Sequence, residues 1–431
     1  MRRLATALGL LAAAAAGPAA AEMRIEVEHP PPGSSFTGDL PAFVAGWAVP
    51  PGHSHPRRDV VVVIDVSAST LEAFERPDVP ERPAAVPGAP LREGSVLEAE
   101  IAATRRLLHT LDPRFTRVAV VTFSGEPLGQ SPALPRWTES LDPAAVTWVG
   151  LTHDWSAVER ALDAVAEAGA HGLTHIAAGV ERATAELTGR TGAESRADPG
   201  ARHSILFMTD GIPTLPVPGD TRRNQLEVFK QVRRAAKHGI EIHAYAVGRE
   251  ALRGPFTLET MATETGGTFT AVRDPATLPD RLPVVQLAGL DGVQVRNLTT
   301  ERDALATHLR PDGTFDALVK LAPGANRIEV VATATDGDSG RRVLVMQRRD
   351  AASGRPALPD HLVSRRGELL EKDLEERREA RRRQLDEEIR RGRADDEESE
   401  AAAQRRELEL EVGREPPSVG AAPEPPPPAA D

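Results

Sequence analysis

Five polar residues stand where this chain could assemble a set of oxygen ligands: Asp65, Ser67, Ser69, Thr174 and Asp210. The first three follow the apolar run Val60–Ile64 directly, and Asp210 follows Leu206–Thr209. Thr174 precedes a segment of helical composition. Ligands of an open α/β sheet bind at the carboxyl ends of its strands, so these three loops could converge on one point.

The chemistry of such a cluster is that of a hard cation. Two carboxylates and three hydroxyls form an all-oxygen set without nitrogen or sulfur, which favours Mg²⁺ or Mn²⁺, with Ca²⁺ as an alternative. Mg²⁺ keeps octahedral geometry and retains waters, so one coordination position can stay open. Because these ligands carry little formal charge, the ion would remain electrophilic and could accept a carboxylate from a partner.

Each of these residues also has a simpler role open to it. Ser67 and Ser69 could be helix N-caps, and Thr174 could cap the helix that starts near His175. Asp210 with Gly211 could form an ordinary turn. Caps and turns alone do not readily explain why all of them stand at the ends of separate strands, so the hypothesis of a metal site rests on their combination.

The elements that would position these residues begin at Asp59, where apolar strands alternate with amphipathic helices. This order predicts an α/β fold with a mostly parallel central sheet. The expected strands are Val60–Ile64, Arg117–Gly125, Ser204–Gly211, Ile240–Gly248 and Gly267–Val272. The expected helices are Ser95–Thr110, Trp155–Ala168, His175–Leu187, Arg222–His238 and Thr257–Thr265.

Both flanks of this unit have the patterning of β-structure. Residues 24–50 contain short alternating segments separated by Pro/Gly turns, and Arg327–Asp336 alternates with a period of two. Neither flank is long enough for a large core of its own. We therefore expect residues 22–56 and 284–350 to form one β-sandwich, into which an α/β domain of residues 57–283 is inserted.

The C-terminal part is dense in charge. Residues 361–412 are predicted to form a helix. Acidic residues stand four positions ahead of basic ones, as Asp373 does before Arg377 and Glu379 before Arg383. The apolar residues of this segment make only a broken stripe, so either a solvated helix or a coiled coil that docks a partner or self-associates fits the pattern. Residues 413–431 are rich in proline and are expected to be a disordered tail.

The N-terminal residues 1–21 have the features of a secretory signal peptide. A basic start, an apolar run and an Ala-x-Ala site predict cleavage after about Ala21. No second long apolar run follows, so we expect no membrane span in the mature chain and a periplasmic or secreted location. Cysteine is absent, which excludes a disulfide framework, and the formal net charge of −12 argues against nucleic acid as a partner.

The residues of the candidate metal site resemble a known family. The pattern Asp65-x-Ser67-x-Ser69, then Thr174 in "GLTHIAAG", then "TDGIP" around Asp210 is similar to the von Willebrand factor type A (VWA) domain over about residues 57–283. This resemblance implies a Rossmann-like domain with a metal-ion-dependent adhesion site that binds Mg²⁺. It further implies direct or near-direct coordination by Ser67, Ser69 and Thr174, with Asp65 and Asp210 acting through water or as outer acceptors.

Two departures from the family pattern stand beside the motif. Ala68 replaces the glycine that the family often has, which stiffens the turn and leaves the ligands intact. A Pro/Ala-rich insert at residues 71–94 follows the motif immediately, and it could either rim the site or be inert. The flanking β segments resemble bacterial immunoglobulin-like modules more weakly, chiefly in "LAPGANRIEVVATATD".

No catalytic residues are expected. The chain has no Gly-x-Ser-x-Gly elbow, no P-loop and no His-Glu-x-x-His pattern. The histidine pairs His53/His55 and His171/His175 are better explained as surface residues than as zinc ligands, since zinc needs three or four convergent ligands.

The function that the sequence favours is that of an exported, bacterial, non-enzymatic binding protein. Its Mg²⁺-dependent site would engage an acidic residue of a protein partner in binding or adhesion. The alternative is a structural or assembly factor of the cell envelope that acts through its C-terminal helix, with the metal site stabilising the fold.

Overall fold

The computed structural model describes residues 23–38, 40–51, 56–71, 91, 93–126, 143–349 and 356–412, and the side chains up to residue 390 except 385, 386, 388 and 389. The expected signal peptide, the linker histidines His53 and His55, most of the 71–94 insert and the Pro-rich tail lie outside the described residues.

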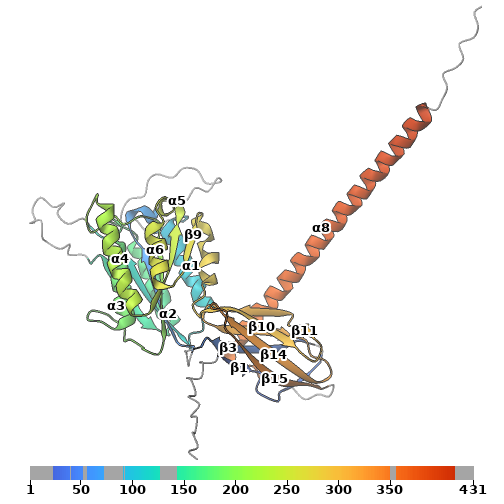
Figure 1. The fold of residues 1–431 in the computed structure, drawn as a ribbon, viewed down its shortest axis with the longest axis horizontal. Helices are drawn as coiled ribbons and strands as arrows, with labels where there is room; N and C mark the ends of the chain where they lie inside the picture. The colour runs from blue at the N-terminus through green and yellow to red at the C-terminus, as the bar shows by residue number, and fades with distance from the viewer. Residues whose placement is uncertain are drawn as a thin grey trace, which may run out of the picture. The chain divides into compact units, whose positions relative to one another are not determined.

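A mostly parallel sheet forms the centre of the α/β part (Figure 1). Its strand order is β6-β5-β4-β7-β8-β9, and every neighbouring pair is parallel except β5 and β6. The strands span Thr116–Phe123 (β5), Arg58–Asp65 (β4), Arg202–Thr209 (β7), Ile240–Val247 (β8), Phe269–Val272 (β9) and Ala145–Thr152 (β6). The predicted α/β class is confirmed.

The edge strand β6 was not among the expected strands. Its sequence, AVTWVGLT, mixes apolar residues with threonine and glycine, and most of its residues are half-buried. It joins the sheet by antiparallel pairing with β5, which is a tertiary contact that no local pattern encodes.

Helices cover both faces of this sheet because β4 sends alternate side chains to opposite sides. Val60, Val62 and Ile64 belong to one core with residues of α1 (Val96–Thr110) and α2 (Trp155–Ala168). Val61 and Val63 belong to a second core with α3 (Ile176–Thr188), α4 (Thr221–Lys237) and α6 (Phe256–Thr265). A continuous valine strand is therefore buried on both faces, which fixes the position of its last turn.

Two antiparallel-rich sheets flank the α/β part, and each one combines N-terminal with C-terminal strands. The first has the order β1-β3-β13-β12, and the second has the order β11-β10-β14-β15-β2. The N-terminal strands are Arg24–His29 (β1), Ser35–Thr37 (β2) and Ala42–Val49 (β3). The C-terminal strands are Leu290–Asn297 (β10), Arg302–Asp303 (β11), Ala306–Leu309 (β12), Thr314–Val319 (β13), Gly324–Ala334 (β14) and Ser339–Arg349 (β15).

The long central pairing of the first flanking sheet joins β3 to β13, from Ala42↔Val319 to Trp47↔Thr314. Apolar residues from both sheets, such as Val44, Phe315 and Ile328, form a shared core. Segments about 270 residues apart in the sequence thus meet in one sheet, as the pairing of Ala42 with Val319 shows.

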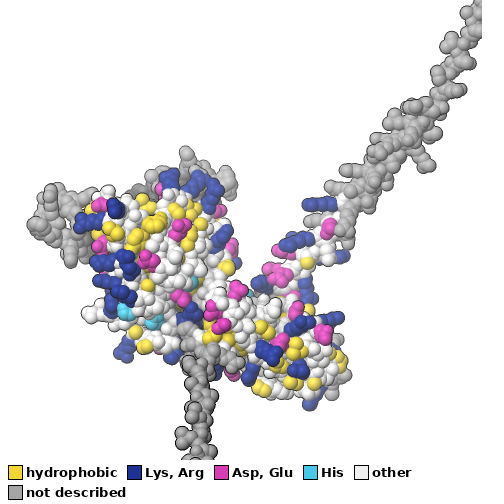
Figure 2. Space-filling model, in the orientation of Figure 1, with side chains coloured by type: hydrophobic (Ala, Val, Ile, Leu, Met, Phe, Trp, Pro, Cys, Tyr) yellow, Lys and Arg dark blue, Asp and Glu magenta, His cyan; other side chains and the backbone are white. Residues whose placement is uncertain are grey.

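The helix α8 runs from Asp360 to Val412, and residues from Gly367 onward form a compact unit separate from the rest of the chain. Acidic and basic side chains alternate along its described part (Figure 2). Two of the expected pairs are formed, Asp373 with Arg377 at 2.9 Å and Glu379 with Arg383 at 3.3 Å. Among the described residues, no helix combines the length and the apolar character that crossing a membrane would need.

Candidate functional site

The candidate site begins at the turn that ends β4. The Asp65 carboxylate accepts a hydrogen bond from the Ser67 backbone N–H at 2.8 Å through Oδ1. Its other oxygen accepts from the Thr209 hydroxyl of β7 at 2.5 Å. Residues Ala68–Leu71 then form one 3₁₀ turn. Two neighbouring strands thereby hold the carboxylate in a single orientation.

A chain of hydrogen bonds connects this turn to the other two loops. The Thr174 hydroxyl donates to Ser67 Oγ at 3.3 Å, and the hydroxyls of Ser67 and Ser69 lie 3.2 Å apart. Ser69 Oγ in turn donates to Asp210 Oδ1 at 2.8 Å. The structure therefore brings the five sequence-predicted residues into one cluster at the carboxyl ends of β4 and β7.

Backbone contacts fix the loop that carries Thr174. The Leu173 N–H donates to the Gly125 carbonyl at 2.7 Å, and the Ala68 N–H donates to the Gly172 carbonyl at 3.0 Å. The Thr174 N–H donates to the Thr214 hydroxyl at 2.9 Å, so the segment after Asp210 also supports this loop. The hydroxyl of Thr174 is consequently aimed by three separate segments.

The donor chemistry of the cluster fits a hard divalent cation. All five side chains offer oxygen, four of them are buried, and Ser69 is exposed, so the cluster opens to solvent at that residue. Hydroxyl and carboxylate oxygens around an open position suit Mg²⁺, which retains water ligands. That these residues bind a cation, and that the cation is Mg²⁺, stay predictions.

Burial makes the site costly to ionise without a cation. Desolvation raises the pKa of Asp65 to about 6, although hydrogen bonds from Ser67 and Thr209 act against this. Desolvation, followed by the neighbouring charges of Asp65 and Asp210, raises the pKa of Glu100 well above its usual value. Carboxyl groups are thus gathered where a bound cation would favour their ionised form.

Glu100 is a residue of this site that the motif did not reveal. It lies on α1, is fully buried, and accepts the Asp65 backbone N–H at 3.1 Å through Oε2. One signal in the sequence could have found it. Glu100 interrupts the apolar stripe formed by Leu97, Ile101, Leu107 and Leu108, where a charged residue needs a specific reason.

The two histidines beside Thr174 lie in different settings. His175 caps α3 by accepting the Ala178 N–H at 3.2 Å, and burial lowers its pKa. His171 is exposed. In the part of the chain that the structure describes, no three histidine or acidic side chains come close enough to hold an ion by themselves.

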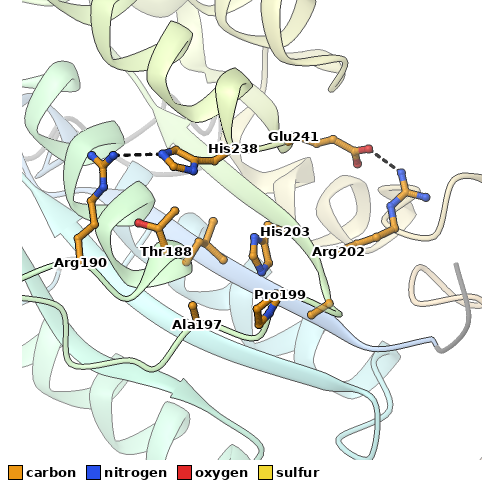
Figure 3. Close-up of a pocket in the computed structure, with 11 residues that line it drawn as sticks. Thr188, Arg190, Ala197, Pro199, Arg202, His203, His238 and Glu241 are labelled. Carbon is orange, nitrogen blue, oxygen red and sulfur yellow. Dashed lines mark hydrogen bonds and ion pairs between the residues drawn. The ribbon is translucent and has the colours of Figure 1, made fainter. Parts of the chain in front are cut away.

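A separate pocket of about 600 Å³ lies at the opposite, amino ends of β7 and β8 (Figure 3). Arg190 donates to His238 there at 3.1 Å, and Arg202 pairs with Glu241 at 2.5 Å. Arg190 and His238 stand just beyond the C-terminal ends of α3 and α4, where basic groups stabilise the helix dipole. Helix termination accounts for these two residues, so the pocket is a weaker candidate than the oxygen cluster.

Comparison with known protein families identifies the α/β part of the chain. A family model described as the von Willebrand factor type A domain matches residues 59–282, which is more than half of the chain. A search of curated proteins finds no match.

Among solved structures, similarity is found to the pilus adhesin SpaC from Lactobacillus rhamnosus GG, with 12% identity and a TM-score of 0.40. This alignment covers 78% of the present chain and 50% of the SpaC chain, so the chain spans half the length of that protein. The PilB minor pilin from Streptococcus sanguinis matches with 10% identity and a TM-score of 0.36, over 61% of this chain and 75% of that one. Scores this low establish no shared function.

Proposed function

The chain belongs to the von Willebrand factor type A domain family, and from this membership we propose that it is an exported binding protein whose site holds a divalent cation. Asp65, Ser67, Ser69, Thr174 and Asp210 would hold the cation, with Mg²⁺ as the ion that the donor set suits best. The cation would supply an electrophilic position that accepts an acidic side chain of a protein partner.

One observation carries this proposal. Hydrogen bonds join residues from three loops into one cluster, and these loops are far apart in the sequence, as the contact between Ser69 and Asp210 illustrates. Helix capping gives no reason for Ser69 to reach Asp210, whereas a shared cation does. The exposure of Ser69 leaves access for a partner on that side of the cluster.

Thermal unfolding with and without Mg²⁺ tests the cation. We expect Mg²⁺ to raise the Tm of the wild-type protein and Asp65→Ala to abolish that rise, because Asp65 anchors the turn and supplies charge. Asp198→Ala is a suitable control, since Asp198 pairs with Arg57 away from the site. No change of Tm with Mg²⁺, Mn²⁺ or Ca²⁺ in the wild type would refute the proposed cation.

Capture of a partner from envelope extracts, with Mg²⁺ or with EDTA, tests the binding role. The alternative role in envelope assembly is favoured by the exposed apolar residues Val363, Leu370 and Leu374, which share one side of α8. Deletion of residues 367–431 separates the two roles. The metal-dependent role predicts that this deletion keeps partner capture and that Asp65→Ala loses it, and the assembly role predicts the reverse.

A further inference from the structure

Glu100 is a buried carboxylate that the local structure satisfies only in part. Its side chain is fully inaccessible to solvent, and Oε2 accepts the Asp65 backbone N–H at 3.1 Å. Its other oxygen, Oε1, has no hydrogen-bond partner. A buried carboxylate with an unmatched oxygen is unfavourable unless another group compensates it.

A second buried glutamate shows how this protein satisfies such a group for purely structural reasons. Glu186 on α3 is equally inaccessible to solvent, yet its two oxygens accept hydrogen bonds from Thr147, Glu194 and Ser195. The guanidinium of Arg182 lies 3.6 Å away as a counter-charge. Glu186 thus has several hydrogen-bond donors and a guanidinium beside it, and Glu100 has no such counter-charge among the described residues.

No counter-charge reaches Glu100 within the described parts of the chain. None of the ion pairs found among those residues includes it, and the charges that act on it most strongly are the like charges of Asp65 and Asp210. The other buried residues of its helix are apolar except Thr104, whose hydroxyl donates to the Glu100 backbone carbonyl and not to its carboxylate. The nearest place for a compensating charge is the oxygen cluster, which Glu100 contacts through the Asp65 N–H.

We propose that Glu100 is a positioning residue of the cation site: it holds the Asp65 peptide in place and supplies a third negative charge that strengthens cation binding. We assign it a positioning role because the contact that its carboxylate makes is with the Asp65 peptide, and among the described residues it belongs to no cluster of three acidic or histidine side chains. Its carboxylate acts through the Asp65 N–H and through its field in a medium of low dielectric constant. This inference rests on the proposed function, since it requires the cluster to bind a cation.

Isothermal titration with Mg²⁺ on the full-length protein tests the proposal through the variant Glu100→Gln. The amide oxygen of glutamine can still accept the Asp65 N–H, so the variant keeps the hydrogen bond and removes only the charge. We expect the Kd for Mg²⁺ to rise about tenfold or more, which corresponds to about 1.4 kcal/mol. Glu186→Gln is the matched control, a buried helical glutamate away from the cluster, and its Kd is expected to stay within about twofold of the wild type.

Three results would decide against the proposal. A Kd of Glu100→Gln within about twofold of the wild-type value leaves Glu100 a purely structural residue. The second variant, Glu100→Asp, keeps the charge but is one methylene shorter, so it should bind Mg²⁺ more tightly than Glu100→Gln; the opposite order overturns the role of charge. A wild-type protein that binds no divalent cation refutes the proposed function itself, and this result is visible before any variant is compared.

Discussion

At the scale of single residues, the site places acidic groups where water cannot solvate them. Asp65 and Glu100 are both fully buried, and the Glu100 carboxylate accepts a hydrogen bond from the Asp65 backbone N–H. Carboxylates in such a place favour the protonated form until a cation arrives. Cation binding and proton release are therefore linked.

This linkage predicts how pH acts on stability. The pKa of Asp65 is about 6 in the folded protein against 3.8 in the unfolded chain, so the folded form binds the proton more tightly. Without a cation, this group's contribution to the free energy of unfolding falls by about 3 kcal/mol as pH rises from about 4 to above 6. Glu100 acts in the same direction, because its pKa is also raised.

A bound cation favours the ionised carboxylate, so it reverses the preference of Asp65 and Glu100 for the protonated form. We expect the rise of Tm caused by Mg²⁺ to be small at about pH 5 and larger at about pH 7.5. Thermal scans with and without Mg²⁺ at both pH values measure this difference. An equal Mg²⁺ effect at the two pH values would contradict the role given to these carboxylates.

At the scale of elements, the loop that carries Thr174 depends on a glycine. Gly172 has φ +75°, and a Cβ placed there would lie 2.6 Å from the Gly125 carbonyl oxygen. The same carbonyl accepts the Leu173 N–H at 2.7 Å, so a side chain at position 172 would push apart the segments that aim Thr174.

Gly172→Ala is therefore expected to lower the free energy of unfolding by about 2 kcal/mol and to weaken Mg²⁺ binding. Gly219→Ala is the matched control, because Gly219 has φ +82° but no atom within 4 Å of the added Cβ. For Gly219→Ala the free energy of unfolding should fall by only about 1 kcal/mol, and the affinity for Mg²⁺ should stay unchanged. Urea denaturation and Mg²⁺ titration measure both quantities, and equal losses in the two variants would argue against the close approach at Gly172.

At the scale of the whole molecule, buried polar groups join the α/β part to the flanking sheets. The side chain of Arg58, at the start of β4, donates to the Asp312 carbonyl at 3.0 Å. The Asp112 N–H donates to Asp312 Oδ2 at 2.6 Å. Arg365, near the beginning of α8, pairs with Asp316 at 2.7 Å and with Asp112 at 3.5 Å. One arginine thus contacts an acidic residue on each side of the junction.

Arg365→Leu is expected to lower the free energy of unfolding by about 3 kcal/mol, because it leaves buried carboxylates with fewer counter-charges. Arg310 still pairs with Asp316 in the variant, so the protein should remain folded. The exposed Arg378 on the same helix serves as the control, and Arg378→Leu should change stability by less than about 0.5 kcal/mol. Urea denaturation measures the free energy of unfolding of both variants. Similar losses in the two would show that the ion pairs of Arg365 contribute little to stability.

The sequence by itself determined the local elements and the kinds of chemistry available. Apolar periodicity placed β4, β7 and β8 and the helices between them, because strand and helix periods depend on neighbouring residues. The spacing of Asp65, Ser67 and Ser69 predicted a turn rich in oxygen ligands. The division of the chain at residues 22–56, 57–283 and 284–350, and the likeness of its flanks to immunoglobulin-like modules, stay predictions.

The sequence predicted that the three loops converge, whereas the tertiary structure decided the particular contacts between distant residues. It added β6 as an antiparallel edge, paired β3 with β13, and set the unmatched carboxylate of Glu100 behind Asp65. It also joined Ser69 to Asp210 across 141 positions of the chain. The physical reason is that strand pairing and packing act between segments far apart in the sequence, whereas a residue pattern reports only the periodicity of its own segment.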